Sequence, residues 1–201
     1  IKFNGKDLLE IESGELRNMR LKEFSIVFQS SMNVLNPVMN IKDQIFDGVQ
    51  CHMKMSRKLL EKHAKELLEL VKVSPKYLDA YPHQLSGGMK QRVVIAIALS
   101  LNPKLIIMDE PTTALDVVVQ RGILQEIDEL RRKFGFSIIF ITHDLSLLVE
   151  ISDKIMIMYA GRVVEKASSK RLYANPLHPY SYGLMHSSPP LVGKRQRLHG
   201  I

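Results

Sequence analysis

The apolar residues of this chain follow two kinds of pattern along its length. Short continuous apolar runs at residues 24–28, 105–109 and 137–142 are bounded by polar residues, which is typical of buried strands. Within residues 41–72, and again within residues 117–133, apolar residues recur every three or four positions and predict helices. A helix that joins two such strands fits a β–α–β crossover, whose parallel strands are buried on both faces. We therefore expect an α/β fold.

The clearest helical pattern lies in RKLLEKHAKELLELVK, at residues 57–72. Its apolar positions form one stripe of a helix, and we expect the whole stripe to face the core. The stripe consists of Leu59, Leu60, Ala64, Leu67, Leu68 and Val71. The Ser74-Pro75 pair ends the helix.

Two turn signals predict hairpins outside the parallel sheet. The Asn4-Gly5 pair stands between apolar positions, and the Ala160-Gly161 pair interrupts a second apolar stretch. From Asn175 onward the chain is rich in Pro, Ser and Tyr and shows no clear periodicity. We expect this tail to be an extension with little core of its own.

The amino-acid composition limits the classes of protein to which this chain can belong. The chain has 201 residues, of which 45% are hydrophobic and 24% charged, and this balance is typical of a soluble globular domain. No apolar run approaches the roughly 20 residues of a membrane span, and the lone Cys51 excludes an intrachain disulfide. The net charge of +7 would suit nucleic acid or an anionic membrane. However, the basic residues are scattered, apart from a small cluster at Lys194, Arg195 and Arg197, and most of them read as solvated surface.

The stretch LSGGMKQR places Ser86, Gly87 and Gly88 at the start of a helix. Glycine destabilises a helix, so two of them in the first turn need a reason, and the N-terminus of a helix is a binding site for anions. A helix that Ser86 caps explains the apolar residues that follow as core, but it does not explain the glycines. The pattern predicts a phosphate site.

Polar residues also follow two of the predicted strands. Asp109 and Glu110 come at the end of one strand, and ligands of open α/β sheets bind at the carboxyl ends of strands. Asp109 is suited to hold Mg²⁺ and Glu110 to polarise an attacking water, although a solvated acidic pair is the simpler reading. His143 follows the other strand, either as a structural residue or as a donor to a developing negative charge. Asp144 is explained as a helix N-cap.

These motifs together resemble a family. LSGGMKQR, LIIMDEPTTALD and IIFITHD resemble, in order and spacing, the signature motif, the Walker B strand with its D-loop, and the switch histidine of ATP-binding-cassette (ABC) ATPases. Gln29 resembles the glutamine of the Q-loop, and the resemblance covers about residues 1–166. The segments VLNP, YPHQLSGG and NPLHPYSYGLM are similar to ATPase subunits of oligopeptide and dipeptide importers.

The resemblance implies a P-loop NTPase-like parallel sheet core with an ABC helical subdomain and an N-terminal antiparallel β element. Residues 1–39 would be a partial core with the Q-loop, and residues 40–102 the helical subdomain with the signature motif. Residues 103–174 would be the core portion with the Walker B strand, D-loop and switch histidine, and residues 175–201 a C-terminal extension.

The same resemblance implies ATP and Mg²⁺ as ligands and a role for each site residue. Glu110 would be the general base, and His143 would contact the γ-phosphate. Gln29 and Asp109 would bind the Mg²⁺. The other residues expected at the nucleotide are Ser86, Gly87, Gly88, Gln91 and Asp116. Two ATPase domains would pack head to tail, so that the signature glycines of one face the nucleotide of the other.

The implied partners are a second ABC ATPase, identical or different, and transmembrane permease subunits. A periplasmic or extracellular solute-binding protein would act indirectly, and no nucleic acid is expected. The resemblance thus predicts an ATPase that energises peptide uptake, peripheral to the cytoplasmic face of the cell membrane.

The sequence departs from the family in one respect, because it contains no Walker A loop, G-x-x-x-x-G-K-[ST]. The early Gly5-Lys6 pair is followed by Asp7 and reads as a hairpin turn. In the family the loop lies just upstream of a segment like the first twenty residues, so we expect it to precede Ile1 in a longer chain.

Two other classes of function stay open at this stage. One is a soluble ABC-type ATPase of DNA repair or chromosome organisation, which would carry long coiled coils between Gln29 and Ser86. Only 57 positions separate these residues, and they contain no sustained heptads. The other is a non-catalytic remnant without a phosphate loop, against which the presence of Asp109, Glu110 and His143 argues.

Overall fold

The structure, a computed structural model, describes residues 1–29, 34–112, 115–145, 148 and 151–187. The chain forms two compact units, Ile1–Ile141 and Thr142–Ile201, and each is considered separately below. The predicted segments at 1–39, 40–102, 103–174 and 175–201 follow motifs rather than contacts, and they stay a prediction.

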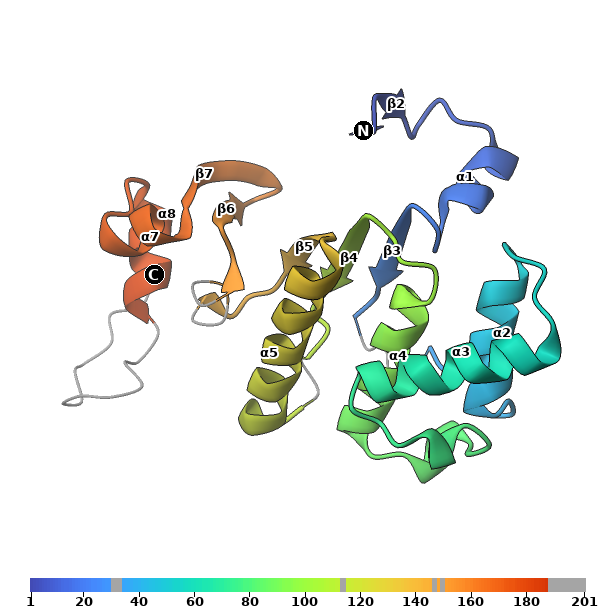
Figure 1. The fold of residues 1–201 in the computed structure, drawn as a ribbon. Helices are drawn as coiled ribbons and strands as arrows, with labels where there is room; N and C mark the ends of the chain where they lie inside the picture. Colours follow the sequence, from blue (N-terminus) through green and yellow to red (C-terminus); the bar gives the residue numbers. More distant parts are fainter. Residues whose placement is uncertain (30–33, 113–114, 146–147, 149–150, 188–201) are drawn as a thin grey trace. The chain divides into compact units, whose positions relative to one another are not determined.

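The centre of the first unit is a parallel sheet of three strands in the order β3-β4-β5 (Figure 1). The strands are β3 (Phe24–Val27), β4 (Leu105–Asp109) and β5 (Ser137–Ile141), all within a residue or so of the predicted runs. α5 (Val117–Phe134) connects β4 to β5, which confirms the predicted crossover. The carboxyl ends of all three strands therefore lie at one edge of the sheet.

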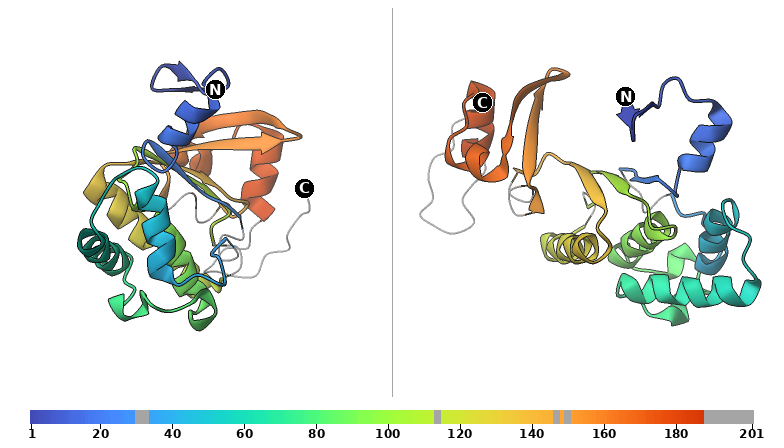
Figure 2. Two further views of the ribbon diagram at one scale, coloured as in Figure 1. Left: turned by 90° about the vertical axis from the view of Figure 1, so that its right-hand side faces the viewer. Right: turned by 45° about the horizontal axis from the view of Figure 1, so that its top comes forward.

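Helices cover one face of this sheet. α4 (Gly87–Leu99) and α5 lie on the same side of the strands, as the right-hand view of Figure 2 shows. The buried Ser25 hydroxyl of β3 donates to the Ala98 carbonyl of α4 at 2.7 Å and ties the two layers together. On the other face Ile26 and Ile139 are 40% and 46% exposed. The prediction that the strands are buried on both faces is therefore wrong for the described residues, since in the first unit both covering helices pack on one side.

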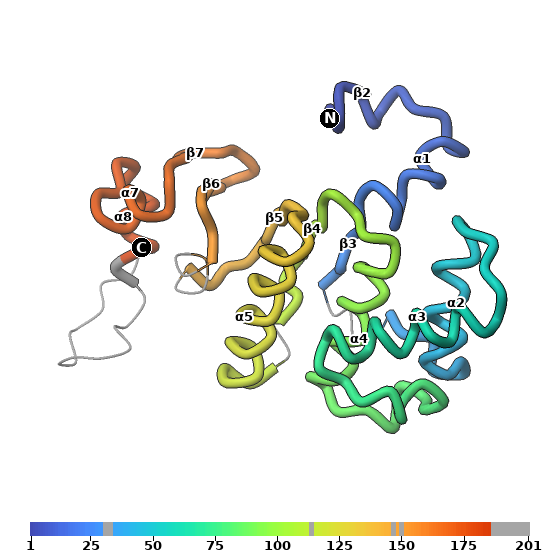
Figure 3. The backbone as a smooth tube through the Cα atoms, in the orientation of Figure 1, coloured from blue at the N-terminus to red at the C-terminus, as the bar shows by residue number. Residues whose placement is uncertain are grey.

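A helical segment is inserted between β3 and β4, and the tube in Figure 3 follows the chain into it and back. It contains α2 (Ile41–Gln50), α3 (Arg57–Leu70), the short 3-10 turns Pro75–Tyr77 and Pro82–Gln84, and α4. Asn40 caps α2 by accepting from the Asp43 amide at 2.8 Å. The predicted apolar stripe of α3 is buried except for Leu59, which is 54% exposed because it lies beside the stripe rather than in it.

The first residues form the predicted hairpin. β1 (Lys2–Phe3) pairs with β2 (Lys6–Asp7) through a turn in which Asn4 and Gly5 both have positive φ, 49° and 82°. Asn and Gly are the residues that tolerate this conformation, so the turn signal has a direct physical cause. α1 (Ser13–Met19), which the sequence analysis did not predict, follows the hairpin and buries none of its residues.

The second unit is built on the other predicted hairpin. β6 (Lys154–Tyr159) and β7 (Arg162–Ser168) are antiparallel and turn at Ala160 and Gly161. α7 (Ser169–Ala174) and α8 (Pro179–Ser187) follow. Tyr180, Leu184 and Met185 of α8 pack against the core of this unit, which consists of Leu145, Ile155, Ile157 and Leu172. Residues of the tail thus pack on the core of the second unit. Its mixed composition has no helical periodicity, so α8 could not be predicted from the sequence pattern.

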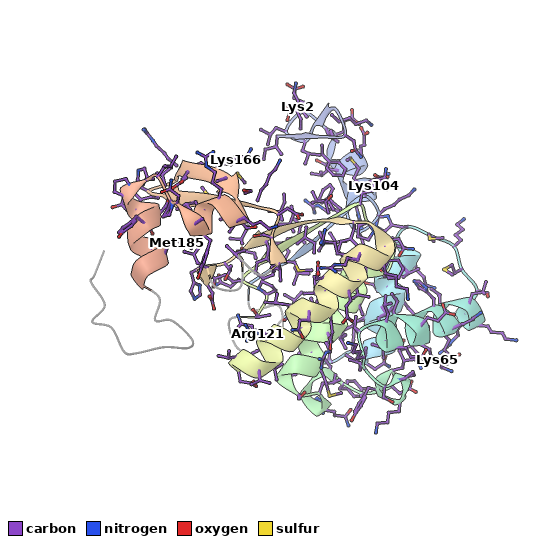
Figure 4. The ribbon with its side chains drawn as sticks, turned by 60° about the vertical axis from the view of Figure 1, so that its left-hand side comes forward. Lys2, Lys65, Lys104, Arg121, Lys166 and Met185 are labelled. Atoms are coloured by element: carbon purple, nitrogen blue, oxygen red, sulfur yellow. The ribbon has the colours of Figure 1, made fainter. Side chains whose placement is uncertain are left out.

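Basic side chains are spread over many elements, as the labels in Figure 4 show. Lys65 belongs to α3, Lys104 precedes β4, Arg121 belongs to α5 and Lys166 to β7, and all four are exposed. The prediction that they form a solvated surface holds for these residues.

Candidate functional site at the ends of the strands

The carboxyl ends of β3 and β4 bring two predicted site residues into contact. Gln29 lies two residues beyond β3 and Glu110 one residue beyond β4. The Gln29 amide Nε2 donates to Glu110 Oε2 at 2.8 Å, although 81 positions separate the two residues in sequence. The contact exists because parallel neighbouring strands end at the same edge. The hydrogen bond holds the Glu110 carboxylate in place as an acceptor.

The backbone at Glu110 is unusual. Its φ is +43°, a conformation that a residue with a side chain rarely adopts. The Glu110 amide donates to the Ile141 carbonyl at 2.9 Å, which extends the β4–β5 ladder by one residue and fixes the turn. Residues held in such conformations cluster at active sites, where the surrounding structure stabilises them. Asp109, the last residue of β4, is half-buried and stands opposite Ile141 in the register.

The predicted phosphate residues begin α4. Ser86 is the N-cap, and its hydroxyl accepts from the Met89 amide at a long 3.4 Å. Ser86 and Gly87 are exposed, whereas Gly88 faces α5: a Cβ built on Gly88 would lie 2.9 Å from Val119 Cγ1. Close packing within the chain therefore supplies a reason for the second glycine that the sequence analysis had lacked. Gln91 is only 1% exposed, so its side chain belongs to the interior of this chain, and its expected place at a nucleotide stays a prediction.

Asp116 occupies the N-cap of α5. Its Oδ1 accepts from the Val119 amide at 3.0 Å, and its side chain is exposed. The residues Thr113 and Ala114 of the expected D-loop lie outside the described residues. Asp116 thus has a structural role as a cap, which leaves its second carboxylate oxygen available at the surface of this turn.

His143 belongs to the second unit, two residues beyond β5, and is exposed. The Asp144 amide donates to the Thr142 hydroxyl at 3.1 Å, and Leu145 is helical, in agreement with a helix that starts here. The structure brings Gln29 and Glu110 together directly. The expected meeting of His143 with them stays a prediction.

No role was predicted for Arg92, the last residue of the LSGGMKQR stretch. Arg92 donates from Nε and Nη2 to the two carboxylate oxygens of Glu126 on α5, at 2.9 and 2.8 Å. A signal was present in the sequence, because Arg92 follows Gly88 by four positions and shares its face of the helix. Its partner lies 34 residues away, and no local pattern identifies it.

Comparison with known proteins assigns this architecture. A family model described as "ABC transporter" matches residues 1–113, more than half of the chain. The chain belongs to the ABC transporter family. A second model, described as "Oligopeptide/dipeptide transporter, C-terminal region", matches residues 164–201.

Similar proteins extend this result. The oligopeptide transport ATP-binding protein OppD of Bacillus subtilis is 47% identical over 193 residues, which are 95% of this chain and 54% of that protein. OppD of Escherichia coli is 43% identical over 191 residues, or 94% of this chain and 57% of that protein. The chain spans between half and two thirds of the length of these relatives.

Solved structures support the fold. The ATP-binding cassette MJ0796 in a dimeric post-hydrolysis state with ADP and Pi has a TM-score of 0.73 and 28% identity, over 83% of this chain and 72% of that one. CbiO1 of Clostridium perfringens, part of an ABC transporter complex, has a TM-score of 0.74 and 30% identity, over 86% and 67%. The predicted fold, an ABC cassette with a parallel sheet, a helical segment and an N-terminal antiparallel pair, is confirmed.

The chemistry of the site fits a magnesium nucleotide. Mg²⁺ prefers oxygen ligands and is commonly bound by one or two carboxylates together with the phosphates of its substrate. Asp109 and Gln29 each offer a side-chain oxygen of this kind at the ends of the strands. Among the described residues, no cluster of three or more His, Cys, Asp or Glu forms a metal cage. In the same part of the chain, none of the helices has both the length and the apolar character needed to cross a bilayer.

Proposed function

We propose that this chain is part of the ATP-hydrolysing subunit of an ABC importer that takes up oligopeptides or dipeptides. The observation that carries the proposal is the contact of Gln29 with Glu110 at the ends of β3 and β4. It places a carboxylate and an amide at the sheet edge where nucleotides bind in α/β proteins. The names of the relatives, which are oligopeptide transport ATP-binding proteins, support peptide as the cargo.

In this proposal Glu110 is the general base. It takes the proton of a water that attacks the γ-phosphorus of ATP, the bond between the γ-phosphorus and the bridging oxygen breaks, and ADP and inorganic phosphate leave. The amide of Gln29 orients the carboxylate toward that water. Bound Mg²⁺, held through Asp109 and Gln29, would neutralise charge on the phosphates. His143 would donate to the γ-phosphate as its charge develops.

The start of α4 serves a second ATPase subunit. Ser86 and Gly87 are exposed at a helix N-terminus, where backbone amides and the helix dipole attract phosphate oxygens. The dimeric MJ0796 structures support the association of two cassettes. Asp116, in the first turn of α5, would link the two composite sites. The assembly would dock on permease subunits at the cytoplasmic face of the membrane, with a solute-binding protein that delivers the peptide.

A chimera tests this function. Residues 1–201 replace the matched part of Bacillus subtilis OppD, and a strain that lacks OppD receives the chimera. We expect uptake of a labelled oligopeptide to return, and the Glu110→Gln chimera, produced at the same level, to leave uptake at background. A folded chimera that restores no uptake and hydrolyses no ATP would contradict the proposal. Equal uptake by both chimeras would instead move the base to another residue.

A further inference from the structure

α4 and α5 are joined at two levels along one face of α4. Near the start of both helices, Gly88 approaches Val119 so closely that an added Cβ would lie 2.9 Å from its Cγ1. One turn later on α4, Arg92 makes its two hydrogen bonds to Glu126. Both contacts lie on the same face of α4, because residues four positions apart share a face.

The Arg92–Glu126 pair differs from an ordinary surface ion pair. The side chains are only 24% and 13% exposed, and the planar guanidinium meets both carboxylate oxygens. Such a two-bond contact is stronger and more directional than a single one, since it fixes the orientation of both groups. Lys72, just after α3, places its Nζ 3.7 Å from Glu126 Oε1 and adds a second positive charge.

These contacts tie together the starts of two functional helices. Gly88 lies in the first turn of α4, two residues from Ser86. Val119 lies in the first turn of α5, where its amide donates to Asp116. The contact between Gly88 and Val119 sets the distance between the two helix starts, and the fork of Arg92 on Glu126 opposes rotation of α4 about its axis. The two contacts therefore hold the start of α4 and the cap of α5 together.

We infer that Arg92 and Glu126 are positioning residues that lock the signature helix to the helix of Asp116. Through this lock, a nucleotide that engages the start of α4 also sets the position of Asp116. The inference rests on the proposed function, because it assigns the two helix starts to one catalytic cycle. Arg92 and Glu126 bind each other, so we assign them to positioning and not to contact with the nucleotide.

The kinetic test uses the OppD chimera. Arg92→Met keeps an unbranched apolar side chain and removes the fork, and Arg92→Lys is a milder variant that keeps the charge but not the two-bond geometry. We expect Arg92→Met to lower kcat for ATP about tenfold, with KM within about twofold, as for a contact that acts in the transition state. The exchanged pair Arg92→Glu with Glu126→Arg should recover only part of the loss, because it places the new guanidinium beside Lys72. Arg131→Met, which breaks a similar pair with Asp128 inside α5, is the matched control and should change kcat less than about twofold.

A double-mutant cycle separates positioning from general stability. Asp116→Asn removes the charge but keeps a good N-cap. If Arg92 acts through Asp116, Arg92→Met lowers kcat less than about twofold in the Asp116→Asn background, because the two lesions damage one coupling. A further tenfold loss in that background would overturn the inference.

Hydrogen exchange gives a readout that does not depend on activity. In the chimera, Arg92→Met should raise exchange in the first turns of both α4 and α5, whereas Arg131→Met should leave both unchanged. An increase confined to α4 would show that the helices are not locked and would overturn the inference. An unmutated chimera without ATPase activity would refute the proposed function. The hydrogen-exchange result would then be the test of whether Arg92 and Glu126 hold α4 and α5 together.

Discussion

The strand ends and the start of α4 carry the two groups of predicted site residues, and they are built in opposite ways. At the strand ends the side chains bind each other, as Gln29 and Glu110 do at 2.8 Å. At the start of α4, Ser86 and Gly87 are exposed. Gly88 and Arg92 lie on the face of α4 that contacts α5. The first group is held by a hydrogen bond within the chain, and the second is exposed. This difference favours chemistry at the strand ends and docking at the helix.

The largest expected effect tests the proposed chemistry at the strand ends. In the chimera, Glu110→Gln keeps the shape of the side chain and removes the base, so ATP hydrolysis should fall by about 100-fold or more. ATP binding, measured by calorimetry, should persist. Glu129→Gln on α5 is the matched control, since Glu129 is exposed and pairs only weakly with Lys72, and its hydrolysis rate should be unchanged. Full turnover in Glu110→Gln would place the base elsewhere.

Much of this fold could be predicted from the sequence because its signals are local. Continuous apolar runs gave β3, β4 and β5, and the Asn4-Gly5 turn gave the first hairpin, since each depends on neighbouring residues. Leu59 was misplaced because a stripe drawn by spacing has no sharp border. α8 was missed because Pro179, Tyr182 and Gly183 give it no apolar face that repeats.

The site residues also differ in whether local sequence signals could predict their contacts. That Gln29 and Glu110 share an edge follows from parallel strands, but their hydrogen bond depends on β3 lying next to β4, which no local pattern reveals. The pairing of Arg92 with Glu126 and the approach of Gly88 to Val119 are long-range in the same sense. Such contacts arise from packing between elements rather than from propensity.

A smaller effect tests the support behind α4. Gly88→Ala should destabilise the chimera by about 1 kcal/mol, because the clash with Val119 outweighs the better helix propensity of alanine. In a Val119→Ala background the same change should stabilise by up to about 1 kcal/mol. Urea unfolding measures both, with Gly122→Ala as the control, since an added Cβ at Gly122 meets nothing within 4 Å. An effect of the same sign in both backgrounds would remove Val119 as the reason for the glycine.

The smallest expected effect concerns a carboxylate that accepts hydrogen bonds from its own chain and has no proposed role in ATP hydrolysis. Glu165 on β7 accepts from the amides of Leu177 and His178, at 2.9 and 3.0 Å, just before α8. Burial acts to raise the pKa of Glu165, but the hydrogen bonds from the two amides and the charge of His178 act to lower it, and the pKa lies below its usual value of 4.5.

A lowered pKa in the folded state fixes the direction of the pH dependence. The contact contributes fully above about pH 4.5, and its contribution is lost as the pH falls through the folded pKa. Hydrogen exchange of α8, corrected for the intrinsic rate, should therefore rise as the pH falls below about 4.5. Glu165→Gln, which cannot ionise, should lack this step. An equal step in both proteins would assign it to another group.

The central claim is that the start of α4 serves the nucleotide of a partner, and mixing two inactive chimeras tests it most directly. Gly87→Asp places a negative charge where the partner's γ-phosphate would dock, and a second chimera has the lysine of its Walker A loop replaced by alanine. Each alone should fail to dimerise with ATP. In the mixed dimer one composite site collects both lesions and the other neither, so ATP-dependent dimerisation, measured by light scattering, should return at least in part. If the mixture stays monomeric and Gly87→Asp alone has lost its affinity for ATP, the glycines bind the chain's own nucleotide, and the account is wrong.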